Sequence, residues 1–172
     1  MTAAEVFELT TAGGATDFGL VIEACAQSGE YCLIGGLAVN CFVDPVYTLD
    51  ADLVLVADAL DAVEEQLSHH GFAVEHFTHS LNAQRSELRI QFTLDPRYQP
   101  FVQRAEPRLV LGELARVACL EDVVQGKLWA WSDPARRLSK RKKDELDLLR
   151  LAEAYPDLLD GYPAPLRSAI GL

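Results

Sequence analysis

The chain has 172 residues, which is enough for a single domain with a core of its own. Hydrophobic residues make up 49% and charged residues 24%, a globular composition that excludes an intrinsically disordered chain. The net charge of −11 argues against general electrostatic binding of nucleic acid, unless the basic residues are clustered.

The cysteines and the apolar segments favour a reducing compartment. The four cysteines form no CxxC pair and each lies in an apolar run, which predicts buried, reduced thiols. No apolar stretch reaches the ~20 residues that a membrane span needs. The first nine residues lack the basic start and apolar centre of a signal peptide. We therefore expect a cytoplasmic protein with no membrane partner.

Hydrophobic periodicity predicts strands with interspersed helices, followed by helices alone. This order predicts an α+β or α/β fold with a C-terminal helical part. We place the sheet-containing core at residues 1–115 and the helical part at 116–172, together forming one compact unit. The segment from Pro156 onward contains three prolines and is predicted to be irregular. The predicted elements are a helix at 16–27, a strand at 31–34, a helix at 37–43, a strand at 49–56, a helix at 59–70, strands at 72–77, 88–94 and 109–111, and two helices from residue 120 that are broken near Pro134.

Two aspartates interrupt the otherwise apolar strand at 49–56. Asp50 and Asp52 are two residues apart, so strand geometry puts both carboxylates on one face, about 6.6 Å apart along the chain. Two like charges on a half-buried strand repel each other and are costly to desolvate, and a divalent cation removes that cost. Mg²⁺ suits such a site because it takes one or two carboxylates together with substrate phosphates. The alternative is an exposed edge strand without a metal.

A double glycine, Gly35-Gly36, ends the preceding strand. Glycine lets the backbone approach a phosphate closely, and the short helix that follows would present its N-terminus there. A tight turn with no ligand is the alternative. Because the double glycine and the acidic pair stand in this order at strand ends, we interpret them together as a site for phosphate and metal chemistry.

These motifs resemble the nucleotidyltransferase superfamily, whose fold is shared with DNA polymerase beta. Its pattern is an apolar strand, Gly-Gly or Gly-Ser, a short helix, and then Thr-x-Asp-x-Asp on the next strand. The resemblance implies a mixed β-sheet flanked by helices and a bound nucleoside triphosphate with Mg²⁺. The implied phosphate-binding residues are Gly35, Gly36 and Thr48, and the implied metal ligands and catalytic residues are Asp50 and Asp52.

Charged side chains also fall on the apolar stripes of the two C-terminal helices. Lys127 lies on the stripe of the first helix, between Val123 and Trp131. Asp144 lies on the stripe of the second, with Asp147 beside it. Charges in such positions either form a structural ion pair or face a site.

The C-terminal helices resemble those of AbiEii-type toxins from toxin–antitoxin and phage-abortive systems, and the resemblance covers roughly residues 30–152. These proteins have Lys-Leu-x-Ala on one helix and Lys/Arg-Lys-Asp-x-x-Asp on the next. The resemblance implies that Lys127 contacts the triphosphate and that Lys143 and Asp144, and less clearly Asp147, close the site. The matching segments here are Lys127-Leu128-Trp129-Ala130 and Lys142-Lys143-Asp144-Glu145-Leu146-Asp147.

A basic run lies between these two motifs. Cations at a helix N-terminus oppose the helix dipole, so the run is either a solvated helix start or a place for an anionic partner. A nucleoside triphosphate or the acceptor end of an RNA would be such a partner. The run consists of Arg136, Arg137, Lys140, Arg141, Lys142 and Lys143.

Two positions depart from the superfamily pattern. Many relatives have an arginine two residues before the threonine, where this chain has Val46. A third carboxylate on a later strand is replaced by Gln91, and a glutamine cannot act as a general base. Asp95 has the same strand parity but stands at the strand end. Either Asp95 replaces the missing carboxylate, or the second metal position is weak, or catalysis is lost.

The sequence therefore predicts an Mg²⁺-dependent enzyme that transfers a nucleoside monophosphate to a hydroxyl of an acceptor such as tRNA or a protein. A place in a toxin–antitoxin system, with a cognate antitoxin as partner, rests on the resemblance alone. The alternatives are a nucleotide-binding module without turnover and an antitoxin-like interaction domain.

Overall fold

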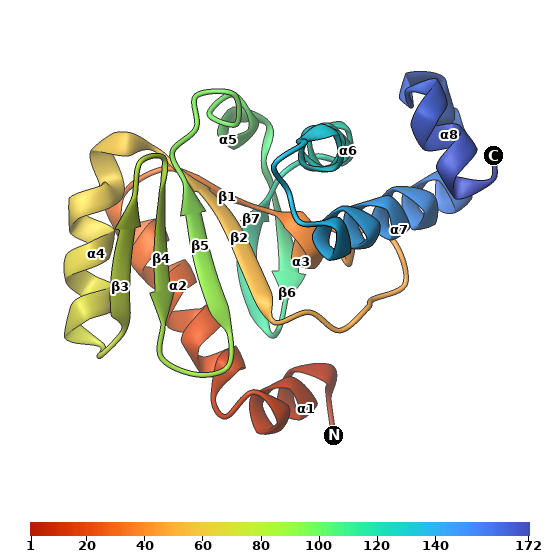
Figure 1. Cartoon of the computed structure of the whole chain (residues 1–172). Helices are drawn as coiled ribbons and strands as arrows, with labels where there is room; N and C mark the ends of the chain where they lie inside the picture. The colour runs from red at the N-terminus through yellow and green to blue at the C-terminus, as the bar shows by residue number, and fades with distance from the viewer.

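The computed structural model describes residues 1–172 and contains one mixed seven-stranded sheet in the order β3-β4-β5-β2-β1-β7-β6 (Figure 1). The β1–β7 and β2–β5 pairs are parallel and the other neighbours are antiparallel. This architecture confirms the predicted fold class. The strands are β1 Tyr31–Ile34, β2 Asp50–Leu55, β3 Ala73–Phe77, β4 Ser80–Gln84, β5 Arg89–Thr93, β6 Glu106–Val110 and β7 Glu113–Val117.

Helices cover the sheet unevenly. In Figure 1, α2 and α4 lie behind and beside the β3–β5 half, whose front face carries no helix, while α3, α6 and α7 gather at the other end. This arrangement leaves a sheet face open beside the C-terminal helices. The helices are α1 Ala3–Thr10, α2 Gly14–Ser28, α3 Gly35–Val39, α4 Leu60–His69, α5 Phe101–Arg104, α6 Leu120–Ser132, α7 Leu138–Ala154 and α8 Ala164–Ile170, with 3-10 turns at Ala57–Ala59 and Pro156–Gly161.

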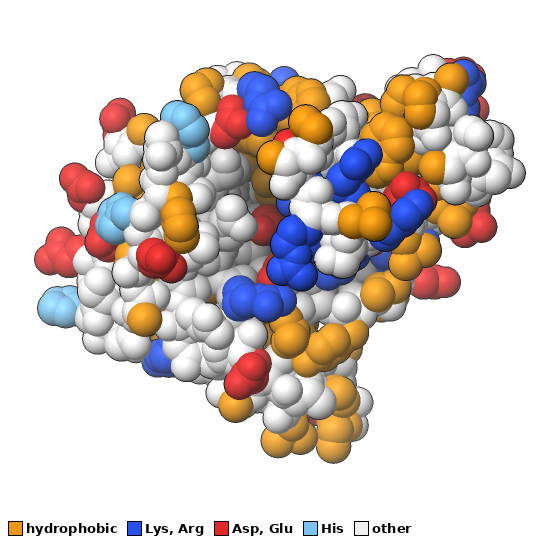
Figure 2. Space-filling view, viewed as in Figure 1, with side chains coloured by type: hydrophobic (Ala, Val, Ile, Leu, Met, Phe, Trp, Pro, Cys, Tyr) orange, Lys and Arg blue, Asp and Glu red, His pale blue; other side chains and the backbone are white.

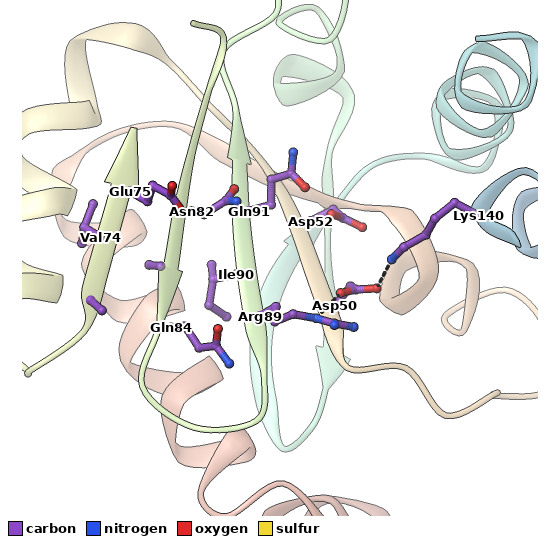
Figure 3. Close-up of a pocket in the computed structure, with 12 residues that line it drawn as sticks. Asp50, Asp52, Val74, Glu75, Asn82, Gln84, Arg89, Ile90, Gln91 and Lys140 are labelled. Atoms are coloured by element: carbon purple, nitrogen blue, oxygen red, sulfur yellow. Dashed lines mark hydrogen bonds and ion pairs between the residues drawn. The ribbon is translucent and has the colours of Figure 1, made fainter. Parts of the chain in front are cut away.

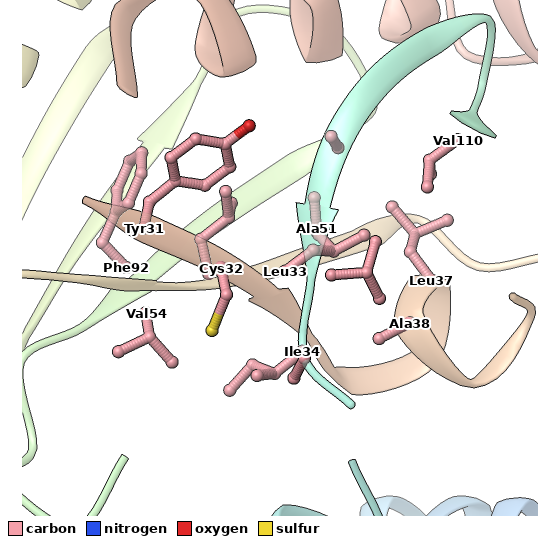
Figure 4. Close-up of a cluster of buried hydrophobic side chains, with 14 of the residues drawn as sticks. Tyr31, Cys32, Leu33, Ile34, Leu37, Ala38, Ala51, Val54, Phe92 and Val110 are labelled. Carbon is pink, nitrogen blue, oxygen red and sulfur yellow. The ribbon is translucent and has the colours of Figure 1, made fainter. Parts of the chain in front are cut away.

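The core follows from the side-chain pattern of the strands. All four residues of β1 are buried, as expected for a central strand without a solvent-facing side. In β5, Ile90 and Phe92 are buried while Arg89 and Gln91 face outward, which is the two-residue alternation of a half-buried strand. Figure 4 shows the residues of β1, β2 and α3 packed together in this core. The alternation therefore sends the polar set of β5 to the open face.

All four cysteines are free thiols. Burial raises the pKa of Cys25 and Cys32 to about 12, so neither forms a reactive thiolate at neutral pH. No helix of the structure has both the length and the apolar character that crossing a bilayer requires.

Two predictions about the early part of the chain were wrong. The helix predicted at 37–43 begins at Gly35 and ends at Val39, because Asn40 turns to bind the loop that follows. Its amide donates to the carbonyl of Val46 at 2.7 Å and its oxygen accepts from the Val46 N–H at 3.0 Å. The strand β4 was missed because its five residues carry only two buried apolar side chains, Leu81 and Ala83.

The prediction of an irregular segment after Pro156 was also wrong. A 3-10 turn begins at Pro156 and α8 follows Pro163, because proline is well tolerated in the first turn of a helix. Leu166 of α8 is fully buried, and the hydroxyl of Tyr162 donates to the carbonyl of Leu148 at 2.8 Å. The last helix is thereby attached to α7.

Candidate active site

Strand register brings the double glycine against the acidic pair. Ile34 of β1 pairs with Asp52 of β2, so Gly35 lies beside the Asp52 side chain. A Cβ atom added to Gly35 would stand 3.0 Å from the Cβ of Asp52 and closer still to its carboxylate. Gly35 also has a φ of +71°, a conformation that favours glycine. Both the space and the backbone conformation therefore require glycine here.

The two aspartates have different surroundings. Asp50 is fully paired: its Oδ1 accepts from Arg89 Nε at 2.8 Å and its Oδ2 from Lys140 Nζ at 2.9 Å. Burial opposes the charge of Asp50, but Lys140 and Arg89 outweigh it and lower the pKa of this carboxyl. Lys140 was predicted only as part of the basic run, and its partnership with Asp50 was not predicted.

Asp52 has no hydrogen-bond or ion-pair partner in the structure. Its desolvation raises its pKa, the cation Lys127 acts against this effect, and the charge of Asp50 adds to it. An unpaired, partly buried carboxylate beside a second carboxylate carries an uncompensated desolvation cost. Asp52 is therefore the group in this region most in need of a cation.

Thr48, Gly36 and Lys143 adjoin one another next to the acidic pair. The Oγ1 of Thr48 accepts from Lys143 Nζ at 3.2 Å and from the Asp50 N–H at 3.3 Å. A Cβ added to Gly36 would lie 3.5 Å from the same Oγ1. Lys143 has no carboxylate partner, so its charge is available to an anionic ligand.

Lys127 belongs to a buried ion network between α6 and α7. Its Nζ lies 3.0 Å from Asp144 Oδ1 and 2.7 Å from Asp147 Oδ2, and its side chain is only 8% exposed. Burial favours the neutral amine, but Asp147 and Asp144 outweigh it and raise the pKa of Lys127. Arg136 and Arg150 pair with the far sides of the two carboxylates. The sequence had left a structural ion pair open as one alternative, and the structure contains that pair.

The part of the basic run that lies in α7 divides between two faces of the helix. Lys140, Lys143, Asp144 and Asp147 follow the spacing of one helix face, and their partners place that face toward the sheet and α6. Lys142, in contrast, pairs with Glu145 at the surface. Figure 2 shows basic side chains around a hollow with acidic atoms at its centre.

Two adjoining pockets meet at Asp52. One, of about 170 Å³, is lined by residues of the glycine turn, β5, α6 and α7. The other, of about 360 Å³, extends over the open face of β3–β5 (Figure 3). The residues that line both are Asp52 and Gln91.

Gln91 and Asp95 are the two candidates for the third carboxylate position, and they lie differently relative to these pockets. Gln91 pairs in register with Asp52, on the strand where the resemblance predicts a third carboxylate. Asp95 lines neither pocket, and both its oxygens accept from the guanidinium of Arg97. This ion pair lowers the pKa of Asp95. Asp95 thus lies outside both pockets that contain Asp52, and its carboxylate is bound to Arg97.

Sequence reasoning did not name Arg89, and it named Arg136 only as a member of the basic run. Arg89 stands on the polar face of β5, and the signal for it was its shared strand parity with Gln91. Arg136 donates through Nε to Asp144 Oδ2 at 2.6 Å and lines the smaller pocket. Neither contact could be foreseen without the strand order and the placement of α7.

The sequence that builds this site matches the model of a known family. The family model described as nucleotidyl transferase AbiEii toxin, type IV TA system, matches residues 25–170. The chain belongs to this family of nucleotidyltransferases. No curated protein matches the sequence.

Solved structures share the fold at low sequence identity. The antibiotic-resistance factor ANT(2'')-Ia aligns with a TM-score of 0.60 and 12% identity, over 92% of this chain and 97% of its own. JHP933 from Helicobacter pylori aligns with a TM-score of 0.58 and 16% identity, over 90% of this chain and 70% of its own. The lincosamide antibiotic adenylyltransferase LnuA aligns with a TM-score of 0.53 and 13% identity, over 88% and 98%. At these identities the likeness concerns the fold.

The glycine turn offers a direct test. Gly35→Ala should lower the free energy of unfolding by at least about 1 kcal/mol, because it forces a side chain into a positive-φ position and against Asp52. Gly36→Ala is the matched control and should leave that free energy unchanged or slightly raised, since its nearest neighbour would be 3.5 Å away. Urea unfolding measures both, and equal effects of the two substitutions would contradict the assigned packing.

Proposed function

We propose that the chain is an Mg²⁺-dependent nucleotidyltransferase that moves a nucleoside monophosphate from a nucleoside triphosphate to a hydroxyl of an acceptor. The observation that carries this proposal is the unpaired Asp52 carboxylate beside Asp50, at the Gly35 turn. The family supports transfer of this kind, while the metal and the acceptor belong to the proposal.

The donor set suits magnesium. Asp50 and Asp52 offer carboxylate oxygens from one strand face, and no group of three histidine, cysteine or acidic side chains gathers anywhere in the structure. Two protein ligands are too few for a closed structural metal site but are common for Mg²⁺, which takes its other ligands from phosphates and water. Bound between Asp50 and Asp52, Mg²⁺ would neutralise phosphate charge and lower the pKa of the attacking hydroxyl.

The cationic side chains would hold the triphosphate. Lys143, with Thr48 and Gly36 beside it, offers a charge that no carboxylate neutralises. Lys140 is bound to Asp50, and its ammonium would be free to pair with the phosphates if Asp50 held a metal. The Lys127–Asp144 pair fixes α6 and α7 to each other, and contact of Lys127 with the phosphates remains a prediction. These residues would counter the negative charge that develops on the leaving pyrophosphate.

In the transfer, the acceptor hydroxyl oxygen bonds to the α-phosphorus and the bond to the pyrophosphate oxygen breaks. The bonding electrons leave with pyrophosphate, and the hydroxyl proton passes to solvent because Gln91 cannot accept it. The acceptor would be an RNA such as tRNA or a protein, in a cytoplasmic toxin–antitoxin setting with a cognate antitoxin. The absence of a carboxylate at Gln91 is also the observation that favours the second candidate, a nucleotide-binding module with weak or no turnover.

Substitutions of Asp50 and Asp52 test the proposed function directly. Asp50→Asn and Asp52→Asn should each reduce transfer of label from nucleoside triphosphates to total tRNA or lysate protein by at least about 100-fold, because metal stabilisation is worth several kcal/mol. Asp95→Asn is the matched control and should leave transfer unchanged, since Asp95 pairs only with Arg97. Full activity of Asp52→Asn would remove the site assignment. Calorimetric binding of nucleotide without any transfer would support the second candidate.

Substitution of Lys140 should change the affinities for the metal and for the triphosphate in opposite directions. Lys140→Gln removes the ammonium that competes for Asp50, so it should tighten Mn²⁺ binding in the absence of nucleotide by about two- to fivefold, the range for a partly exposed ion pair. The same substitution should weaken binding of a non-hydrolysable triphosphate with Mg²⁺. Electron paramagnetic resonance of Mn²⁺ and calorimetry give the two affinities, and a change in the same direction for both would contradict the displacement of Lys140.

A further inference from the structure

A row of polar side chains crosses the open face of the sheet, beginning at Asp52. Asp52 pairs in register with Gln91, Gln91 with Asn82, and Asn82 with Glu75, so one residue from each of four adjacent strands lies in line. Figure 3 shows the four side chains following one another across the floor of the larger pocket. The row thus leads from the proposed catalytic carboxylate to the outermost strand, β3.

The outer part of this row lacks partners within the protein. The Oδ1 atom of Asn82 is buried and accepts no hydrogen bond. A buried polar atom normally has a partner. Asn82 itself is only partly buried and lines the pocket, so a rotation of its amide would bring this oxygen to a donor from outside the chain. Glu75 also has no ion-pair or hydrogen-bond partner and is exposed to the pocket. The pocket volume of about 360 Å³ lies in the range of small-ligand sites.

The charges in the pocket are unevenly distributed. Arg89 and Lys140 stand at the Asp50 end, where both are bound to its carboxylate. At the other end Glu75 is the single charged residue among those that line the pocket. A phosphate over β3 would meet this negative charge with no cation beside it, whereas an ammonium group would be attracted.

We propose that the row from Asp52 to Glu75 is the acceptor subsite and that it takes a hydroxyl acceptor carrying an ammonium group. This inference rests on the proposed function and specifies its substrate class. The reactive hydroxyl lies at Asp52, a polar group of the acceptor binds the amide of Asn82, and the ammonium binds Glu75. Three strand spacings separate Asp52 from Glu75, so the hydroxyl and the ammonium are on the order of 10 Å apart in the acceptor once side-chain reach is subtracted.

Two kinds of molecule carry both a hydroxyl and an ammonium group, namely an amino sugar and a lysine-containing peptide. The probes are therefore the deacetylated trisaccharide of chitin, which bears hydroxyls and ammonium groups, and a Ser-Gly-Gly-Lys peptide. Cellotriose, the neutral counterpart of the trisaccharide, controls for the hydroxyls. Each is titrated by calorimetry into the full chain in the presence of Mg²⁺ and a non-hydrolysable triphosphate.

We expect at least one of the two cationic probes to bind, with an affinity at least several-fold higher than that of cellotriose. Glu75→Gln should lower the affinity for the cationic probe by roughly fivefold, because a charge-assisted contact is lost. The variant should then bind the cationic probe no more tightly than cellotriose. Glu65→Gln, on the exposed side of α4, is the matched control and should leave the affinity unchanged. Nucleotide affinity should be the same in all three proteins.

Two results would overturn the inference while leaving the proposed function intact. One is normal nucleotide binding with equal affinity of the cationic probe for wild type and Glu75→Gln. The other is label transfer to total tRNA that increases in Glu75→Gln, because it would show phosphates passing over this position. If the wild-type chain bound no triphosphate, the proposed function itself would fail, which is a separate outcome.

Discussion

The site depends on the close approach of Gly35 to the Asp52 carboxylate. The register of β1 and β2 sets this approach, and the lack of a side chain on Gly35 permits it. The result is a desolvated acid without a partner, whose pKa is raised by burial. Because the folded state then holds the proton more tightly than the unfolded chain, Asp52 contributes stability at low pH that is lost as pH rises through its folded pKa. A cation held by Asp52, as proposed, would offset that loss at neutral pH.

The remaining charges divide into a structural set and an available set. Lys127, Asp144 and Asp147 are ion-paired in the interior and hold α6 against α7. Breaking such a buried set by removing one partner is costly, which makes the relative position of the two helices well determined. That position in turn aims Lys140 and Lys143 at β2. The helical part of the chain therefore completes a site whose acids come from the sheet.

The sequence was sufficient for features that depend on local spacing. The period of two residues put Asp50 and Asp52 on one strand face, and the double glycine marked the end of β1. The partners of Asp50 could not be predicted, because Arg89 reaches it from a parallel neighbour and Lys140 from a helix ninety residues away. The unpaired Asn82 was equally hidden, since it lies on β4, a strand too short and polar to be recognised.

The helical content of the C-terminal segment was hidden for another reason. Its prolines stand at the starts of helical turns, where they are tolerated, and periodicity alone does not separate a starting proline from a breaking one. The residue roles at the site remain predictions, and they share one requirement, which is that Asp52 accepts a cation.

The pKa of Asp52 is the measurement that tests this requirement most directly. Titration of the aspartate carboxyl carbons by nuclear magnetic resonance, assigned with Asp52→Asn, should show Asp52 above the ordinary value of 3.8 in the metal-free chain. Addition of Mg²⁺ with a non-hydrolysable triphosphate should lower that pKa, because a bound cation favours the ionised form. A pKa at or below 3.8 that does not respond to Mg²⁺ and nucleotide would contradict the account.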